Sequence, residues 1–306
     1  MLKIKKYAAI DIGSNAMRLL IMNIIEEKGK DTIFSKSSLV RVPIRLGQDS
    51  FTKGEISKEA RNRMIDAMKA YYLLMKVNKV ERFMACATSA MREADNAVEL
   101  VEEIYKESNI KISIIDGKKE AMIIASSDLK QYITENSNVM YIDVGGGSTE
   151  FTIFSKGKQV NSRSFENGTV RLINDMVSKH VWVDIENWIK ENTKGLEDLN
   201  VIGSGGNINK IFKMSGKTQD KPLTYSYLHQ QYNRLKDMSY EERISLLGLN
   251  PDRADVIIPA LKIYSNAMKW SGAKYIYVPK IGVSDGIVKA IYHDKIPLDY
   301  QTIEIE

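Results

Sequence analysis

Cysteine and histidine are scarce in this sequence. Its 306 residues include one cysteine, Cys86, and three histidines that lie far apart. A single cysteine cannot form an intramolecular disulfide, and zinc sites need several His or Cys ligands at close spacing. The sequence therefore argues against a disulfide framework and against a zinc centre, and we expect any bound metal to be held by oxygen ligands.

Cys86 lies in the segment FMACATSA, which is typical of the end of a buried strand. We interpret it as a core thiol rather than a nucleophile, because no histidine lies nearby in the sequence and buried thiols are usually unreactive.

Long hydrophobic runs and strongly biased segments are also absent. No stretch approaches the roughly 20 uncharged apolar residues that span a bilayer, and Asp11 interrupts the first apolar run too early for a signal peptide. The net charge of +5 is mild, and the basic residues are scattered rather than clustered. We expect a cytoplasmic protein without a membrane or nucleic-acid partner, although an anionic substrate is permitted.

What the chain does contain is enough apolar sequence for two folded domains. Hydrophobic residues make up 43% of the chain and charged residues 27%, which is ordinary for a globular protein of this length. No linker rich in Pro, Gly or Ser separates two halves, so we place the boundary where the strand pattern restarts, between residues 126 and 138. The predicted domains are residues 1–126 and 127–306.

Two segments of the chain nearly repeat each other. Residues 6–15 read KYAAIDIGSN and residues 140–150 read MYIDVGGGSTE, so that Asp143 follows Asp11 by 132 residues. Each is an apolar strand that reaches an acidic residue and then a turn of glycine and hydroxyl residues. A repeat of this kind indicates one structural unit used twice.

The order of elements supports two similar halves. After the first strand, two more strands complete a predicted antiparallel meander, and Ser57 caps a helix whose apolar positions recur every three or four residues. The first half reads βββαβαβα. The second half repeats the meander, with a helix from Thr169, a strand ending in VIGSGG and a last helix over residues 284–293. This pattern predicts an α/β fold with mixed sheets covered by helices.

The two glycine turns are candidate phosphate-binding loops. Glycine lets backbone N–H groups approach phosphate oxygens, and hydroxyls add further donors. A single turn of this kind is more often a plain hairpin, but two matching turns favour phosphate binding. The candidate residues are Gly13, Ser14, Asn15, Gly145, Gly146, Gly147, Ser148 and Thr149.

Asp143 and Glu150 flank the second turn and are candidate metal ligands. Carboxylates of this kind suit Mg²⁺, which uses one or two of them together with water and substrate phosphate. The alternative is that Asp143 bonds only its own loop and that Glu150 is a solvated strand residue.

Arg92 and Glu120 each lie near the start of a helix that follows a strand. Arg92 suits bidentate phosphate binding, although a lone arginine is more often a surface ion-pair partner. Glu120 is either a base that activates water or a first-turn acid that interacts with the helix dipole, and spacing alone does not decide between them.

With these motifs in place, the chain resembles the Ppx/GppA family of exopolyphosphatases and guanosine pentaphosphate phosphohydrolases, within the actin-like ATPase superfamily. The resemblance is carried, in family order, by AAIDIGSN, RLGQ, ATSAMR, IIDGKKEA, YIDVGGGSTE, NGTVRL, VIGSGG, RADVIIPA and VSDGI. It implies two actin-like (ribonuclease H-like) lobes, each with a mixed five-stranded sheet covered by helices. It also implies an active site in the interlobe cleft, with helix 284–293 packing back at the interface.

The resemblance also implies roles for the candidate residues. Glu120 would be the general base, Asp143 and Glu150 would hold Mg²⁺, and the two glycine loops with Arg92 would bind phosphates; Asp11 and Arg18 are further candidates. Lys119 stands where many members have an acidic residue, which we expect to lower the pKa of the adjacent carboxylate. We expect a short form without the additional C-terminal helical domains of longer members, and a homodimer is compatible with the resemblance.

The resulting hypothesis is a Mg²⁺-dependent exopolyphosphatase that releases orthophosphate from inorganic polyphosphate, with guanosine pentaphosphate (pppGpp) as the alternative substrate. Attack on a terminal phosphoryl group needs an oriented water, a base and donors around the phosphate oxygens. Two alternatives of another class stay open. One is an ATP-dependent kinase that uses residues 203–210 as a nucleotide turn, and the other is a non-catalytic actin-like sensor or assembly protein.

Overall fold

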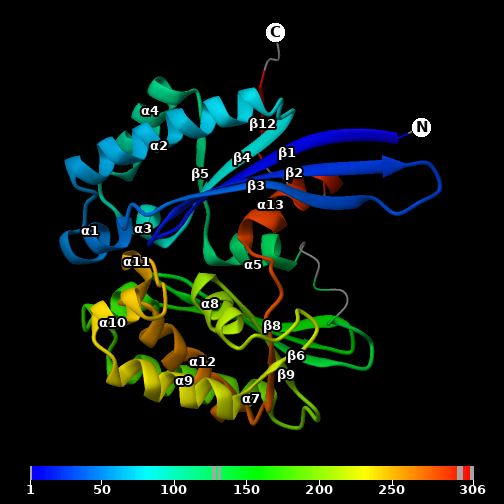
Figure 1. Cartoon of the computed structure of the whole chain (residues 1–306), viewed down its shortest axis with the longest axis vertical. Coiled ribbons are helices and arrows are strands. Elements are labelled where there is room, and N and C mark those ends of the chain that lie inside the picture. Colours follow the sequence, from blue (N-terminus) through cyan, green and yellow to red (C-terminus); the bar gives the residue numbers. More distant parts are fainter. Residues whose placement is uncertain (1, 126–128, 130–131, 295–298, 304–306) are drawn as a thin grey trace. The chain divides into compact units, whose positions relative to one another are not determined.

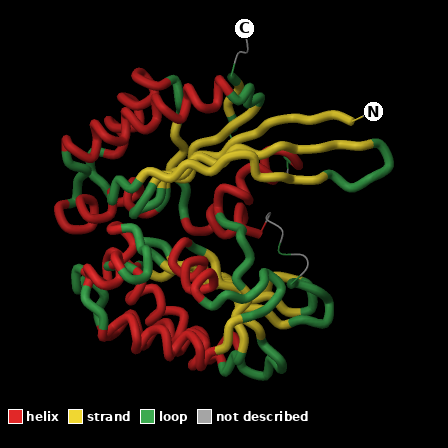
Figure 2. The backbone as a smooth tube through the Cα atoms, viewed as in Figure 1, coloured by secondary structure: helices red, strands yellow, loops and turns green. Residues whose placement is uncertain are grey.

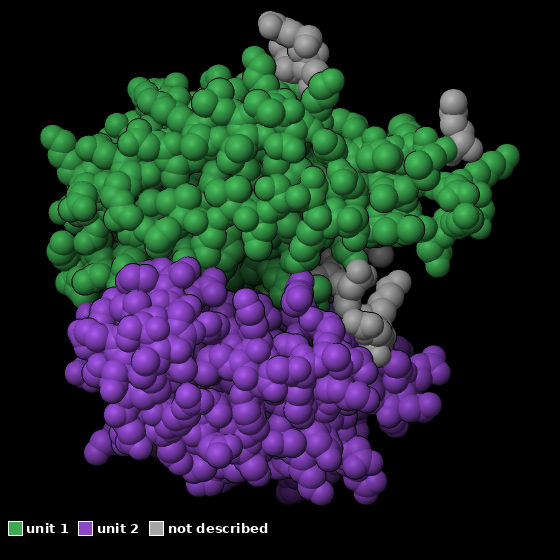
Figure 3. Space-filling view, viewed as in Figure 1, with its two compact units in different colours: residues 1–127, 281–306 green, residues 128–280 purple. Residues whose placement is uncertain are grey.

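The computed structural model describes residues 2–125, 129, 132–294 and 299–303. The chain divides into two compact units, which Figure 3 shows in different colours. Unit 1 consists of residues 1–127 and 281–306, and unit 2 consists of residues 128–280. Each unit contains one mixed sheet with helices packed against it, which confirms the predicted α/β class.

The sheet of unit 1 begins with the predicted antiparallel meander. Strands β1 (Leu2–Ile12), β2 (Met17–Glu27) and β3 (Ile33–Val42) pair in sequence. On its other side β1 pairs in parallel with β4 (Arg82–Ala87), and β4 pairs in parallel with β5 (Ile112–Ile114). The carboxyl ends of β1 and β4 therefore lie side by side, so the first glycine turn and the segment after β4 are neighbours.

Helices cover both faces of this sheet, with α2 and α4 on one face and α5 and α13 on the other (Figure 1). As predicted, Ser57 caps α2 by accepting a hydrogen bond from the backbone N–H of Ala60. The helices of unit 1 are α1 (Leu46–Lys53), α2 (Lys58–Val77), α3 (Ser89–Glu93), α4 (Ala97–Ser108), α5 (Gly117–Ala125) and α13 (Val283–His293).

The sheet of unit 2 repeats the plan. Its strands follow the order β10-β11-β9-β6-β7-β8, in which β6, β7 and β8 form the meander and β9 is parallel to β6. Figure 2 draws the strands of both sheets in yellow and the helices in red. The strands are β6 (Asn138–Val144), β7 (Thr149–Ser155), β8 (Lys158–Phe165), β9 (Asn200–Ser204), β10 (Leu223–Thr224) and β11 (Tyr275–Tyr277).

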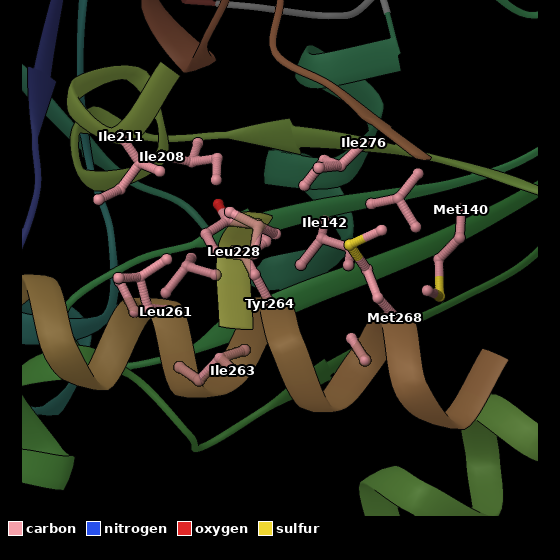
Figure 4. Packing of buried hydrophobic residues seen from close by; sticks show 14 of the residues in the cluster. Met140, Ile142, Ile208, Ile211, Leu228, Leu261, Ile263, Tyr264, Met268 and Ile276 are labelled. Carbon is pink, nitrogen blue, oxygen red and sulfur yellow. The ribbon is translucent and has the colours of Figure 1, made fainter. Parts of the chain in front are cut away.

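The core of unit 2 is built around α12, which contacts α7, α8, α9 and β6. Figure 4 shows Leu261, Tyr264 and Met268 of α12 packed with Ile142 of β6 and Ile276 of β11. The helices of this unit are α6 (Thr169–Ile173), α7 (Lys179–Thr193), α8 (Gly206–Met214), α9 (Tyr225–Asp237), α10 (Tyr240–Ser245), α11 (Pro251–Ala254) and α12 (Ile257–Ser271). Across the described part of the chain, no helix combines the length and the apolar character needed to cross a bilayer.

The prediction of five strands in each sheet is wrong, because the described residues form six strands in each sheet. The additional strands are β12 (Gln301–Thr302), which pairs with β4, and β10, which pairs with β11. Strands of two residues carry no hydrophobic period of their own. β12 is held by long-range contacts instead: the side-chain amide of Gln301 accepts from the Lys111 N–H at 2.7 Å and donates to the Lys111 carbonyl oxygen at 2.8 Å.

The C-terminal helix α13 lies in unit 1, whereas the predicted second domain included it. It packs against β1, β2, β4 and α5. Its Tyr292 ring contacts the rings of Tyr7 and Phe34, and the Tyr292 hydroxyl donates to Glu26 at 2.7 Å. These partners are more than 250 residues away in the sequence, so no local pattern reveals them. The predicted boundary between residues 126 and 127 falls outside the described residues.

Candidate functional site

The two glycine turns have the same hydrogen bonds at an offset of 132 residues. The Gly13 N–H donates to the Ala16 carbonyl oxygen at 3.2 Å, and the Gly145 N–H donates to the Ser148 carbonyl oxygen at 2.9 Å. Each turn joins the first two strands of a meander, and each follows an acidic residue one position before the strand end. The internal repeat is therefore present in the backbone structure as well as in the amino-acid sequence.

Residues of helix α6 donate hydrogen bonds to the carbonyl oxygens of the second turn. The Thr169 N–H donates to Gly145 O at 3.0 Å and the Val170 N–H donates to Gly146 O at 2.8 Å. The buried Arg171 donates from Nε to Gly147 O, also at 2.8 Å. Three consecutive carbonyl groups thus face the start of α6.

This arrangement orients the N–H groups of the turn. In a trans peptide the N–H points opposite to the C=O of the preceding residue. The N–H groups of Gly146, Gly147 and Ser148 are therefore directed away from α6. Successive N–H groups on one side of a turn form a concave donor site of the kind that binds phosphate.

The first turn is held in the same way by the segment that begins α1. The Gly47 N–H donates to Ser14 O at 2.8 Å, and the Arg45 N–H donates to Asn15 O at 3.0 Å. The N–H groups of Asn15 and Ala16 are consequently directed away from α1. The buried Ser14 hydroxyl lies 3.0 Å from the hydroxyl of Ser89, which ties the turn to the start of α3.

Asp143 and Glu150 are directly opposed on β6 and β7, so both side chains project from the same face of the sheet. Glu150 is only 3% exposed, and its Oε1 accepts hydrogen bonds from the hydroxyls of Ser148 at 2.6 Å and Ser164 at 2.8 Å. Within the described residues there is no cluster of three or more His, Cys, Asp or Glu side chains that could hold a metal. A pair of carboxylates with neighbouring hydroxyls fits Mg²⁺, which completes its shell with water and substrate oxygens.

Two buried tyrosines lie near Asp143. Burial raises the pKa of both Tyr141 and Tyr264 well above the usual value, and the charge of Asp143 raises them further. Both hydroxyls therefore stay neutral at physiological pH. The Tyr264 hydroxyl donates to the carbonyl oxygen of Ser204, which fixes the end of β9 beside Asp143.

Glu120 lies in the first turn of α5, in unit 1, and is 8% exposed. Its N–H donates to the Asp116 carbonyl oxygen at 3.0 Å, and the Asp116 carboxylate accepts from the Lys119 N–H at 2.7 Å, so Asp116 caps the helix. An acid that served only the helix dipole would be expected at the solvent surface, and Glu120 is instead buried.

Arg92 connects α3 to the segment that carries Glu120. Its Nη1 donates to the carbonyl oxygen of Ile115 at 2.8 Å, just before α5 begins. Arg92 is an exposed residue. The further candidates Asp11 and Arg18 form an ion pair at 2.8 Å across β1 and β2, so Asp11 already has a cationic partner within the sheet.

The structure groups the predicted residues by unit. The first glycine turn, Arg92 and Glu120 lie in unit 1, and the second glycine turn, Asp143 and Glu150 lie in unit 2. Sequence reasoning missed the residues that hold the turns, which follow the third strand of each meander. They are Arg45, Gly47, Gly168 and Arg171, and the motifs RLGQ and NGTVRL were the available signal.

Comparison with known proteins identifies similar chains. The bifunctional 3-dehydroquinate synthase/phosphatase of Fusobacterium nucleatum is 28% identical over 312 residues; the match covers 93% of this chain and 46% of that protein, so the chain spans about half of its length. Exopolyphosphatase 1 of Mycobacterium tuberculosis is 21% identical, covering 92% of this chain and 87% of the relative. The crystal structure of an exopolyphosphatase from Cytophaga hutchinsonii superposes with a TM-score of 0.81 at 24% identity, covering 95% of this chain and 98% of the other, and shows the same fold.

The family match extends over most of the chain. Residues 25–294 match the profile of the Ppx/GppA phosphatase family. This range includes helices and strands of both units. This confirms the resemblance found in the motifs, and with it the predicted class of enzyme, a hydrolase of phosphoanhydrides. The chain belongs to the Ppx/GppA phosphatase family.

Proposed function

We propose that this protein is a Mg²⁺-dependent exopolyphosphatase that hydrolyses the terminal phosphoanhydride of inorganic polyphosphate and releases orthophosphate. The observation that supports this proposal best is the duplicated glycine turn. In both copies a following helix segment holds the carbonyl oxygens, so the N–H groups are directed to the opposite side. Polyphosphate presents closely spaced anionic oxygens, which match such donors.

The residues of this chain provide the parts that phosphoryl transfer needs. N–H groups and hydroxyls of the two turns would bind the equatorial phosphate oxygens and orient the terminal group. Glu120 would accept the proton of the attacking water, and its burial excludes competing solvent. Arg92 would bind a further phosphate through its guanidinium.

Asp143 and Glu150 would hold the Mg²⁺ ion, since their carboxylates project from one face of the sheet. When bound, Mg²⁺ supplies positive charge that stabilises the developing negative charge on the phosphate oxygens. The hydroxyls around Glu150 keep its carboxylate in a fixed orientation before the ion arrives.

The pppGpp alternative uses the same chemistry, because the 5′ end of that nucleotide also carries a terminal phosphoanhydride. The kinase alternative depends on a nucleotide at residues 203–210. There the guanidinium of Arg253 lies against Gly206, where Nη2 would be 3.1 Å from an added Cβ. The G-x-x-E-A setting of Glu120 and the position of Glu150 directly after GGGST favour the hydrolase over the kinase.

The test is orthophosphate release by the purified protein with Mg²⁺, comparing short polyphosphate, long polyphosphate, pppGpp and ATP. Glu120→Gln keeps the size of the side chain and removes the base, so turnover should fall by about 10² to 10⁴-fold while substrate binding stays near that of the parent. A mutant with parental turnover on polyphosphate would refute the role of Glu120. Failure of every substrate to release orthophosphate would refute the proposed activity.

A further inference from the structure

A row of polar residues crosses the second sheet at the level of the glycine turn. Glu150 of β7 pairs with Ser164 of β8 on one side and with Asp143 of β6 on the other. Paired residues on adjacent strands project from the same face. The neighbouring residues Phe151 and Val144 belong to the apolar core, so alternation directs Glu150 and Asp143 to the opposite face.

One carboxylate oxygen of Glu150 has two hydroxyl donors. Both Ser148 and Ser164 donate to Oε1, at 2.6 and 2.8 Å. Hydrogen bonds to a carboxylate are short and about twice as strong as those between neutral groups. Together they restrain the otherwise flexible glutamate side chain.

The two serines differ in what else they can do. Ser148 lies in the glycine turn, among the N–H groups directed away from α6, whereas Ser164 lies on the edge strand β8. A serine hydroxyl has one proton to donate. If Ser148 donates to a phosphate oxygen of the substrate, it can no longer donate to Glu150, whereas the hydrogen bond from Ser164 is kept.

We propose that Ser164 is a positioning residue that holds the Glu150 carboxylate for the metal ion, above all when substrate engages Ser148. This inference rests on the proposed metal role of Glu150. Residues that orient metal ligands typically contribute 10- to 100-fold to metal affinity. Ser164 is exposed, so in a variant that lacks its hydroxyl a water molecule can partly take its place. We therefore expect loss of the hydroxyl to lower metal affinity by about 10-fold.

The chain offers a matched control one step along the same ladder. Ser162 pairs with Thr152, and their hydroxyls lie 2.9 Å apart. Ser162→Ala therefore removes a hydroxyl hydrogen bond from the same strand and the same face without touching Glu150. Ser164→Thr keeps the hydroxyl on a β-branched side chain that suits a strand, so it serves as the conservative variant.

The experiment measures Mn²⁺ binding by the whole chain, from the loss of the free-ion signal in electron paramagnetic resonance without tripolyphosphate. With tripolyphosphate, which itself binds Mn²⁺, ultrafiltration measures the Mn²⁺ retained with the protein. Glu120→Gln is used as the background so that tripolyphosphate is not consumed. Ser164→Ala should weaken Mn²⁺ binding about 10-fold, and more strongly with tripolyphosphate present than without it. Ser162→Ala should bind as the parent does, and Ser164→Thr should restore affinity. Circular dichroism should show the same fold in all variants, because Ser164 is exposed on an edge strand.

Several outcomes would overturn the inference: equal Mn²⁺ affinity in parent and Ser164→Ala, equal weakening by Ser162→Ala, or no Mn²⁺ binding by the parent. These outcomes are separable from failure of the proposed activity. Weakened binding in Ser164→Ala supports the positioning role even if no substrate releases orthophosphate. Unchanged binding refutes it even if polyphosphate is hydrolysed.

Discussion

Replacing Gly168 by alanine tests how tightly the second glycine turn is held. Gly168 has φ −108° and ψ 166°, a conformation that alanine adopts freely, so backbone strain is not the issue. An added Cβ, however, would lie 2.2 Å from the Gly146 carbonyl oxygen and 2.4 Å from the Gly147 carbonyl carbon. These are backbone atoms, and they cannot move aside as a flexible side chain does.

The turn must therefore recede by about 0.8 Å before the closest contact reaches the 3.0 Å limit of real structures. Overpacking of this kind typically costs about 1–3 kcal/mol of stability. A displacement near 1 Å in groups that position a substrate costs about 10²-fold in rate. We expect Gly168→Ala to lower kcat/KM for orthophosphate release by about 10²-fold, with a smaller loss in the free energy of unfolding.

The assay is orthophosphate release from polyphosphate, together with urea denaturation followed by circular dichroism. Gly282→Ala is the control, because an added Cβ there meets no atom within 4 Å and its φ is extended. That variant should retain the parental rate and stability. If Gly168→Ala also retained both, the close contact between the start of α6 and the turn would be refuted.

Two further predictions concern the metal and the thiol. Asp143→Ala should raise the Mg²⁺ concentration needed for half-maximal activity by about 10-fold or more, with little change in unfolding, since the residue ends a strand and is partly exposed; coincident Mg²⁺ titration curves of variant and parent would contradict the metal role. Burial, with a further contribution from the charge of Asp11, raises the pKa of Cys86 to about 12 from its ordinary 9.0, so the thiolate is scarce in the folded protein at pH 8 and becomes available on unfolding. Reaction with a thiol-specific disulfide reagent should therefore be slow in native buffer and fast in urea, and rapid native reaction would show that the strand end is open.

Local signals in the sequence predicted much of each unit. Apolar strand segments separated by turns located both meanders, and the hydroxyl before a periodic apolar run located the α2 cap at Ser57. Turn chemistry located both glycine turns, because the conformations available to glycine and hydroxyl residues are local properties. The candidate residues Asp143 and Glu150 followed from the same hairpin pattern, which places them opposite each other.

Sequence could not decide between the two interpretations of Glu120. Both a catalytic base and an acid that interacts with the helix dipole occur in the first turn of a helix, so the two interpretations predict the same sequence. The burial of Glu120 supports the proposed base, and this burial depends on what packs around α5, including α13 from the far end of the chain.

The sequence by itself determined the class of fold, the repeated strand–turn–strand unit and the chemical character of the candidate site. These depend on periodicity, capping and turn residues, which act over a few positions. Only the tertiary structure decided that α13 belongs to unit 1, that β10 and β12 extend the sheets, and that α6 and the start of α1 hold the turns. It also decided that Ser164 reaches Glu150. The reason is physical: each of these features is a pairing between segments distant in the sequence, which exists only once the chain has folded back on itself.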